Sequence, residues 1–582
     1  MRSTLSFLLF TIIFISPLRA NEDVLLTSPD NKISVTITIK EKLEPLPAGK
    51  RIYYAVQVDK KPLLADSPIG IEFKDLPPLD TDLRIIDKKI NHVDQSWQRI
   101  WGKRKNVRNY YNEVTLNIKE TNGLERQIDL ICRAYNDGVA LRYHIPAQTH
   151  LKDFQLSSER FWFNLGRNDT LWAANYGGFI SHQESEFNKQ SLSQLKSGEV
   201  YGCPLLIQAG DIWLAITEAN LSDWAGMYIK RVSGTSAALV TSLSPRPDQA
   251  DVLVRSSAPR TSPWRVLMIG RTAGDLIESD IIANLNDPCE IKDTAWIKPG
   301  KSAWDWWWSA RYAPDAHFKV GSNTETMKYF IDFASEMGWE YQLIDWHWYG
   351  KPFITWDPAP LADPDGNILS QNPDIDIPAL VEYAQSKNVR LLLWLEWSHA
   401  QRQMEEAFPL YEKWGIAGVK VDFMQRDDQE MVNFYHRLIK KAAEHHLLVD
   451  FHGAYKPTGF SRTYPNAITR EGVLGNEYTK WSARVTPVHN VTIPFTRGLL
   501  GEMDFTPGAF VQVTKEKFKA EEDIPPPTVM GTRCHQLAMM VVFESALQIL
   551  CDSPYNYRQK PAGLKASSRS WKLARRESWI LA

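Results

Sequence analysis

Gly418-Val-Lys-Val-Asp-Phe-Met424 decides the fold, because it is a short run of apolar and β-branched residues that carries a carboxylate near its end. A second such run, Leu447-Leu-Val-Asp-Phe-His452, follows an amphipathic segment, and Glu471 and Glu477 come soon after it. Strands that are apolar on both faces are typical of a parallel sheet covered by helices. Two acids at the ends of such strands can face each other across a pocket, which is the minimum requirement for cleaving a glycosidic bond.

The same rhythm extends over the C-terminal half of the chain. From about Asp293, short apolar runs alternate with segments of helical spacing; the runs are 303–308, 341–346, 389–397, 418–423 and 447–452. This alternation predicts a (β/α)8 TIM-type barrel over residues 293–556, with its eighth strand from Leu547. One helix should be capped by Thr324 and end at Gly338, and another should start behind Asp428. The alternative is an open doubly wound sheet, but no glycine-rich phosphate loop follows these runs.

The first half of the chain carries a different pattern. Residues 32–39 and 114–118 alternate apolar and polar side chains, which predicts strands with one buried face. The stretch Asn136-Asp137-Gly138 separates two such runs and predicts a hairpin turn. Long helical patterns are absent here, so we expect an N-terminal β-sandwich domain over residues 21–292.

Composition and the N-terminal segment bound what the protein does. A net charge of -2 and a pI near 6.7 give no field that would recruit nucleic acid or an anionic membrane. Residues 1–20 have an arginine, an apolar core and a small residue at the end, as in a secretory signal peptide. We therefore expect export to the periplasm or outside of a bacterial cell, with no membrane insertion. Five scattered cysteines predict no disulfide framework. Separately, we expect the protein to be a monomer.

Acids and aromatic residues gather at the predicted strand ends, where barrels of this kind hold their active sites. The acids are Asp305, Asp345, Glu396, Asp422 and Asp450. Tryptophans stack on sugar rings, and those near the strand ends are Trp304, Trp306, Trp307, Trp308, Trp346, Trp348, Trp394 and Trp397. The structural alternatives are that a strand-end acid caps a helix or forms an ion pair, and that most tryptophans pack in the core. Their density beside the acids favours a carbohydrate substrate.

A longer motif follows these strands and carries a resemblance. It runs His452-Gly-Ala-Tyr-Lys-Pro-Thr-Gly-Phe-Ser-Arg-Thr-Tyr-Pro-Asn466, with Glu471 and Glu477 behind it, and it resembles glycoside hydrolase family 97, exported bacterial α-glucosidases and α-galactosidases. Inverting members carry a glutamate base directly after the histidine, where this chain has Gly453. Retaining members carry an aspartate nucleophile, which Asp422 matches. The resemblance thus implies a retaining, exo-acting α-galactosidase with Asp422 as nucleophile and Glu477 as general acid and base.

This assignment makes several residues candidates for the site. Asp422 must be ionised and Glu477 protonated, so their pKa values should be pushed apart, and their carboxyl groups should lie roughly 5–5.5 Å apart. Lys420 is expected to hold Asp422 ionised. The resemblance also implies calcium, bound by Glu471, Glu477 and a third glutamate from the N-terminal domain, with Glu184 preferred to Glu186. The α-galactoside should contact a set of strand-end residues: Asp305, Trp308, Asp345, Trp346, Glu396, Lys420 and His452.

Two alternatives to this function stay open: an α-glucosidase of the same family and a non-catalytic carbohydrate-binding protein. The segment 557–582 is basic and lacks the pattern of a strand or turn. Because members of the resembled family continue into a further β-domain, we expect the usual C-terminal β-domain to be missing.

Overall fold

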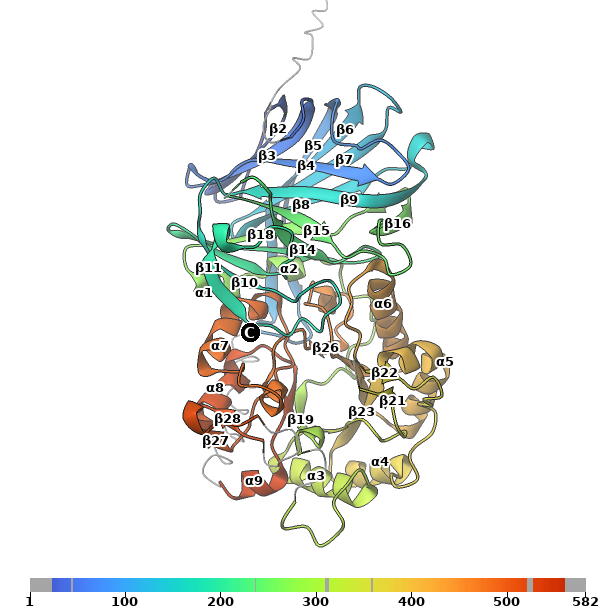
Figure 1. Ribbon diagram of the computed structural model, residues 1–582. Coiled ribbons are helices and arrows are strands. Elements are labelled where there is room, and N and C mark those ends of the chain that lie inside the picture. The colour runs from blue at the N-terminus through green and yellow to red at the C-terminus, as the bar shows by residue number, and fades with distance from the viewer. Residues whose placement is uncertain are drawn as a thin grey trace, which may run out of the picture.

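The computed structural model describes residues 23–42, 46–235, 237–308, 313–356, 360–520 and 527–560. The predicted signal peptide and nearly all of the basic tail lie outside these ranges, so both stay predictions. Figure 1 shows two stacked parts, in which sheets from the first half of the chain lie over strands and helices from the second half. Within the described ranges, no helix has the length and apolar character needed to cross a membrane.

Two antiparallel sheets form the N-terminal part. The first has the order β1-β2-β3-β4-β9-β15-β14, and the second has the order β11-β10-β12-β13-β18-β8-β7-β6-β5. Strands β7 and β8 meet at the predicted hairpin, where Tyr135 pairs with Gly138. The alternating burial along β2 and β6 turns one face of each sheet into a common core, which confirms the predicted β-rich N-terminal domain.

The strands of these sheets have the following bounds: β1 Val24–Thr27, β2 Ile33–Glu41, β3 Lys50–Val58, β4 Lys61–Phe73, β5 Leu83–Gln98, β6 Asn106–Glu120, β7 Gln127–Tyr135, β8 Gly138–Ile145, β9 Asp153–Asn164, β10 Thr170–Ala174, β11 Phe187–Ser191, β12 Leu205–Ala209, β13 Ile212–Ala219, β14 Met227–Arg231, β15 Ala238–Leu243, β16 Val254–Ser257, β17 Arg260–Thr261 and β18 Trp264–Gly270.

The second half forms a nearly closed parallel sheet in the order β26-β25-β24-β23-β20-β19-β29. Residues 502–505 lie between its two ends. The Asp504 amide donates to the Arg470 carbonyl of β26 at 2.9 Å, and the Met503 amide donates to the Glu544 carbonyl ahead of β29 at 2.8 Å. This segment takes the place of a further strand, so the arrangement is consistent with the predicted TIM-type barrel.

The strands of the second half are β19 Gly300–Trp304, β20 Tyr341–Ile344, β23 Arg390–Glu396, β24 Gly418–Asp422, β25 Leu448–Phe451, β26 Ala467–Arg470 and β29 Leu547–Leu550, with the short pairs β21 Phe353–Thr355, β22 Leu361–Ala362 and β27 Gln512–Val513, β28 Val529–Met530. The run predicted as the eighth strand is β29, which pairs with β19.

Helices pack against the outside of this sheet, and their ends follow the capping residues. Helix α3 ends at Gly338 with φ of 67°, as predicted, but it is capped by Asn323 rather than Thr324. The reason is that the Asn323 side chain accepts the Thr326 amide at 2.9 Å. Asp428 caps α6 as predicted. The helices are α1 Ala273–Glu278, α2 Ile281–Asn284, α3 Thr324–Met337, α4 Ile377–Ser386, α5 Trp397–Trp414, α6 Gln429–Glu444, α7 Pro487–Thr492, α8 Arg533–Val542 and α9 Pro554–Arg558.

Candidate active site

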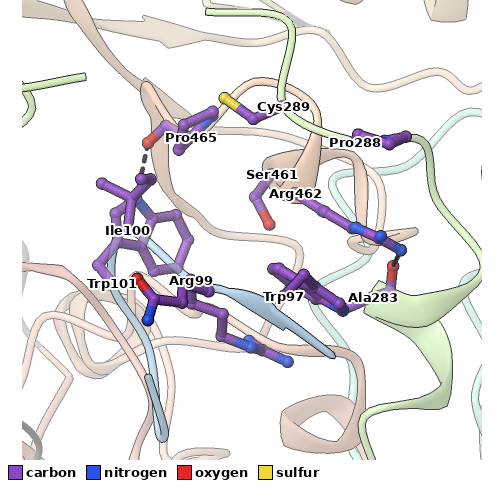
Figure 2. A pocket seen from close by; sticks show the side chains of 11 residues that line it. Trp97, Arg99, Ile100, Trp101, Ala283, Pro288, Cys289, Ser461, Arg462 and Pro465 are labelled. Atoms are coloured by element: carbon purple, nitrogen blue, oxygen red, sulfur yellow. Dashed lines mark hydrogen bonds between the residues drawn. The ribbon is translucent and has the colours of Figure 1, made fainter. Parts of the chain in front are cut away.

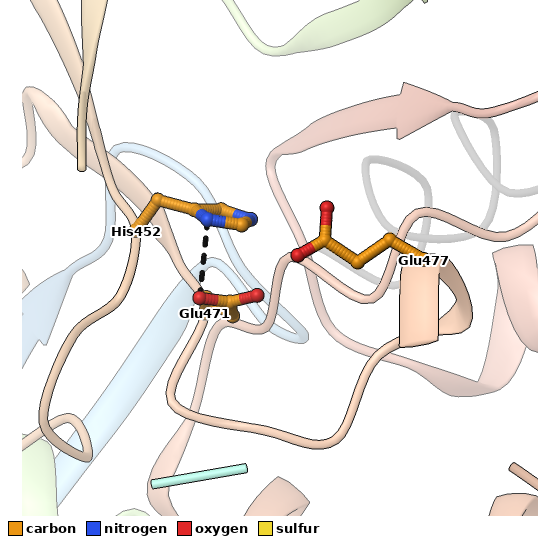
Figure 3. Close-up of side chains that lie close together, drawn as sticks. All are labelled: His452, Glu471 and Glu477. Atoms are coloured by element: carbon orange, nitrogen blue, oxygen red, sulfur yellow. Dashed lines mark ion pairs between the residues drawn. The ribbon is translucent and has the colours of Figure 1, made fainter. Parts of the chain in front are cut away.

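Four side chains meet at the carboxyl ends of three neighbouring barrel strands, and we name them the acid cluster: Asp422, His452, Glu471 and Glu477. Asp422 ends β24, His452 follows β25 and Glu471 follows β26, while Glu477 lies on a 3-10 turn, Asn476–Lys480. The last three are buried, and their ligand atoms lie within 4.8 Å of one another. In Figure 3 the His452 ring lies over Glu471, with its Nδ1 3.1 Å from Oε2, and Glu477 points at both from the other side.

Asp422 is held as an anion. Its Oδ1 accepts the Phe423 amide at 2.6 Å, and its Oδ2 accepts Trp394 Nε1 at 2.9 Å and lies 3.4 Å from His452 Nδ1. Burial acts to raise the pKa of Asp422, but the charge and hydrogen bond of His452, followed by the charge of Lys420, lower it well below its usual range. Lys420 therefore contributes as expected, although His452 contributes more.

The two glutamates of the acid cluster shift in the opposite direction. Burial raises the pKa of Glu477, and the charges of Glu184 and Asp422 add to this, while His452 and Lys420 oppose it. Burial also raises the pKa of Glu471, and among the neighbouring charges that of Glu184 raises it most. The pKa of Asp422 is thus lowered and that of Glu477 is raised, which is the direction of separation that a nucleophile and a general acid require.

Gly453 packs closely against the strand end that carries Asp422. Its φ is +53°, and a Cβ at this position would lie 2.8 Å from the Phe423 amide nitrogen and 3.0 Å from Asp422 Oδ1. Its own amide donates to Glu471 Oε2 at 2.7 Å. The strand end that carries Asp422 therefore leaves no room for a side chain here, and the bare backbone binds Glu471 instead.

A second layer of charge lies behind the acid cluster. Lys420 Nζ is 3.7 Å from Asp345 Oδ2 and 4.6 Å from the Trp304 ring, and Trp304 Nε1 donates to the same oxygen at 2.6 Å. The Asp345 amide donates to Asp305 Oδ1 at 3.2 Å. Burial and the Asp345 charge raise the pKa of Asp305 to about 8. Asp305 and Asp345 are thus joined to Lys420, and their contacts with the substrate stay predictions.

Other predicted contacts have different surroundings. Trp346 packs beside Trp356, with ring centroids 5.2 Å apart, and Trp356 lies 5.7 Å from Phe423, the residue after Asp422. Glu396 caps helix α5, because its Oε2 accepts hydrogen bonds from the Ser398 amide and hydroxyl and from the His399 amide. This is the capping role weighed as the alternative for strand-end acids. The side chain of Trp308 lies outside the described residues, so its role stays a prediction.

The N-terminal domain contributes to this site through the connection between β10 and β11. Glu184 Oε2 lies 3.5 Å from His182 Nδ1, and the His182 ring packs edge-on against Phe423 at 5.3 Å. Glu186 instead pairs with Arg484, whose Nε lies 2.9 Å from Oε1. These contacts favour Glu184 over Glu186 as the acid that faces the cluster.

Two residues of the site were missed by the sequence analysis. His182 lies on a loop with no periodic pattern, and only its place beside Glu184 could have drawn attention to it. Asp504 Oδ2 lies 3.9 Å from His452 Nε2. Burial raises the pKa of Asp450, and the charge and hydrogen bond of Asp504 raise it further. The segment around Asp504 has no strand pattern, because it is a short piece bounded by Gly501 and Pro507.

The donor set of the acid cluster fits a hard divalent cation. Glu471 and Glu477 offer carboxylate oxygens, and Glu184 brings a third carboxylate close enough to raise the pKa of both. Burial and Lys420 act to lower the pKa of His452, but Asp422 and Glu477 raise it to about 9. Carboxylate oxygens are the ligands that a hard divalent cation prefers, so the three glutamates are the donors that suit the site best.

A separate cavity of about 130 Å³ lies away from this cluster, where the end of β5 meets residues 461–465. Figure 2 shows Trp97 and Trp101 on one side and Ser461, Arg462 and Cys289 on the other. The Arg462 guanidinium lies 4.3 Å from the Trp97 ring. Because no carboxylate is among the residues that line it, this cavity lacks the groups for glycoside hydrolysis.

Comparison with known proteins agrees with this geometry. The family profile Glycosyl-hydrolase 97 N-terminal matches residues 26–288, and Glycoside hydrolase 97 matches residues 306–473. The chain is 32% identical over 588 residues to the protein named retaining alpha-galactosidase from Bacteroides thetaiotaomicron, covering 96% of this chain and 83% of that protein. The chain belongs to glycoside hydrolase family 97. The resemblance seen in the His452–Asn466 motif is thereby confirmed.

Two further relatives support the family assignment. This family 97 chain is 30% identical over 501 residues to a probable retaining alpha-galactosidase from Streptomyces bingchenggensis, covering 86% of this chain and 71% of that protein. A family 97 enzyme from Pseudoalteromonas sp. strain K8, solved in complex with acarbose, superposes with a TM-score of 0.82 at 29% identity, covering 94% of this chain and 83% of that one. The protein is therefore a glycoside hydrolase.

Proposed function

We propose that this family 97 enzyme is a retaining α-galactosidase, with Asp422 as nucleophile and Glu477 as general acid and base. The observation that carries the proposal is the ionised Asp422 at the end of β24, beside a glycine that has no room for a side chain. An inverting enzyme would need a base positioned to activate water, and Gly453 offers none. The names of the relatives from Bacteroides and Streptomyces support the same branch and the same sugar.

The reaction follows from these two carboxyl groups. Asp422 attacks the anomeric carbon while Glu477 gives its proton to the leaving oxygen, so that the glycosidic bond breaks and a glycosyl-Asp422 ester forms. Glu477 then takes a proton from water as the water oxygen attacks the same carbon and Asp422 leaves. The two inversions together keep the α configuration. His452 and Lys420 stabilise the carboxylate of Asp422 before attack and after its release.

We propose calcium as the cation of the site, held by Glu184, Glu471 and Glu477. When bound, calcium would supply a fixed positive charge for substrate hydroxyls. His452 orients Glu471 through its Nδ1, and the Gly453 amide holds the second contact to the same carboxylate. Exhaustive chelation is expected to suppress hydrolysis, and added calcium to restore it.

The α-galactoside is proposed to contact the charged layer and the aromatic side of the pocket. Asp345, Lys420 and Asp305 form a linked polar group that suits sugar hydroxyls, while Trp346 offers an aromatic face. We also propose that the enzyme is exported through its N-terminal segment, which would bring it to oligosaccharides outside the cytoplasm. We propose that it acts as a monomer.

One experiment tests both the sugar and the stereochemistry. The enzyme is incubated separately with aryl α-galactoside and aryl α-glucoside, and the first-formed sugar is followed by proton NMR before mutarotation. We expect turnover of the galactoside with α-galactose as the first product. First-formed β-galactose would contradict retention, preferred turnover of the glucoside would make the enzyme an α-glucosidase, and no turnover of either would favour the binding protein.

A further inference from the structure

The loop that carries Glu184 is bound to the barrel by a residue that does not itself face the acid cluster. The Ser181 amide donates to the Gln425 carbonyl at 2.8 Å, and the Gln425 amide donates to the Gly453 carbonyl at 2.8 Å. Two backbone hydrogen bonds thus connect the loop of the N-terminal domain to the strand end beside Asp422. The Ser181 hydroxyl in turn accepts the Gln183 amide at 2.9 Å, so the turn of the loop begins at Ser181.

The side chain of Gln183 holds the next part of the loop against the barrel. Its side chain is 2% exposed, and its backbone has φ of +59°, a left-handed conformation that costs free energy in a residue with a side chain. Its Oε1 accepts the Lys456 amide at 2.8 Å, and its Nε2 donates to Tyr228 Oη at 3.2 Å and to Asp427 Oδ2 at 3.4 Å. The side-chain contacts hold the strained backbone, so the chain turns and presents its neighbours to the site.

Two of these partners, Asp427 and Lys456, belong to a buried set of charges that joins the two domains, which we name the docking cluster: Glu218, Arg265, Asp427 and Lys456. Lys456 Nζ lies 2.7 Å from Glu218 Oε1 and 3.8 Å from Asp427 Oδ2. Arg265 Nη1 lies 2.7 Å from Glu218 Oε2. The Gly226 amide donates to the Asp427 carbonyl at 2.7 Å, and a Cβ on Gly226 would lie 2.3 Å from Asp427 Oδ2. The two domains are therefore in close contact where Gln183 is bound.

We propose that Gln183 is the positioning residue that fixes Glu184 and His182 against the acid cluster, with the docking cluster as its anchor. The inference deepens the proposed calcium site and rests on it. Lys456 and Thr458 belong to the motif that follows His452, and both face the N-terminal domain: the Thr458 carbonyl accepts the Asn220 amide at 3.0 Å. This half of the motif therefore serves domain docking, while His452 and Gly453 serve the chemistry.

The test uses the full chain and two substitutions. Gln183→Glu keeps the length and the acceptor for the Lys456 amide, but it replaces the donor to Asp427 by a second acid. Gln183→Gly removes all three side-chain bonds and tolerates the positive φ, so it carries the test if the first variant fails to fold. Asn188→Ala, an exposed position on β11, is the matched control. Hydrogen exchange of residues 181–186 is measured in chelated protein, and the calcium Kd is measured by isothermal titration calorimetry.

We expect faster exchange in this loop and a calcium Kd weakened by about 10- to 100-fold in both variants. The global unfolding midpoint of the Gln183→Gly variant should stay close to that of the control, whereas Gln183→Glu adds a buried acid beside Asp427 and should lower the midpoint. Unchanged exchange in both variants would overturn the positioning role, as would faster exchange with an unchanged calcium Kd. If the wild-type enzyme itself bound no calcium, the calcium proposal would fail, and loop exchange alone would decide the role of Gln183.

Discussion

The acid cluster and the docking cluster are both buried groups of charges, but they are built in opposite ways. In the docking cluster, Glu218 contacts Lys456 and Arg265 at 2.7 Å each, so the cations match the acid. In the acid cluster, most of the charges that act on Glu471 are those of other acids, and His452 is its ion-pair partner at 3.1 Å. Both glutamates are almost fully buried, at 0% and 1% exposure.

The pKa values of the two glutamates show what this difference means. Burial acts to raise the pKa of Glu218, but the charges of Lys456 and Arg265 lower it below its usual value. Burial raises the pKa of Glu471, and the charges of Glu184, Glu477 and Asp422 raise it further. A buried acid with matched cations serves the structure, whereas a buried excess of acids has to bind something or exchange protons. The following predictions test this contrast.

The largest effect is expected from Asp422→Gly, which removes the nucleophile. Activity should fall by about 10⁴-fold or more, because the covalent step is lost. Azide should restore turnover by attacking from the vacated face, and the product should be the β-galactosyl azide. Identification of the azide anomer by NMR is the measurement.

Glu477→Ala is the matched control for this rescue. There the glycosyl-Asp422 ester still forms from an activated substrate, and azide attacks the ester, so the azide product should be α. An α-azide from Asp422→Gly would contradict the assignment of the nucleophile.

The docking cluster should respond in stability instead. Lys456→Met leaves Glu218 and Asp427 buried with one cation fewer, and we expect the free energy of unfolding to fall by about 3–5 kcal/mol. Lys440→Met is the control, because Lys440 is an exposed lysine 3.9 Å from Glu290 and should change stability by less than about 1 kcal/mol. Denaturant unfolding measures both, and equal losses would contradict the contrast.

The raised pKa of His452 predicts a pH dependence of stability. The folded-state pKa of about 9 lies above the usual 6.5, so the contribution is complete below about pH 6.5 and disappears as the pH rises through 9. The loss should be about 3 kcal/mol relative to His452→Gln. Denaturant unfolding between pH 6 and 10 in the presence of chelator tests this, and parallel profiles for the two proteins would refute it.

The smallest effect is expected from Gly453→Ala. Its Cβ would press on the Phe423 backbone and Asp422 Oδ1, and such a displacement of the nucleophile should lower kcat by about 100-fold. Gly198→Ala is the control, because Gly198 has φ of +91° and open space around its Cβ position. If both variants kept wild-type kcat, the close fit at Gly453 would have no catalytic role.

The acid cluster could be predicted from the sequence because it lies at strand ends. Asp422, His452 and Glu471 each end or follow an apolar run, and parallel strands bring such ends to one rim whatever the helices between them contain. Glu396 shows the limit of this reasoning. A strand-end acid followed by a helix has the same sequence pattern whether it faces the pocket or caps the helix. The contacts of Glu396 with Ser398 and His399 show that it caps the helix.

The sequence by itself determined the alternation of strands and helices, the rim on which the acids gather, and the glycine that stands where inverting members of the family carry a glutamate base. These follow from local periodicity and from residue identity. Only the tertiary structure decided that Glu186 pairs with Arg484, that Asp504 lies beside His452, and that Gln183 joins the domains. The physical reason is that these contacts join residues far apart in the chain, through loops whose conformation is fixed by their partners and not by any pattern of their own.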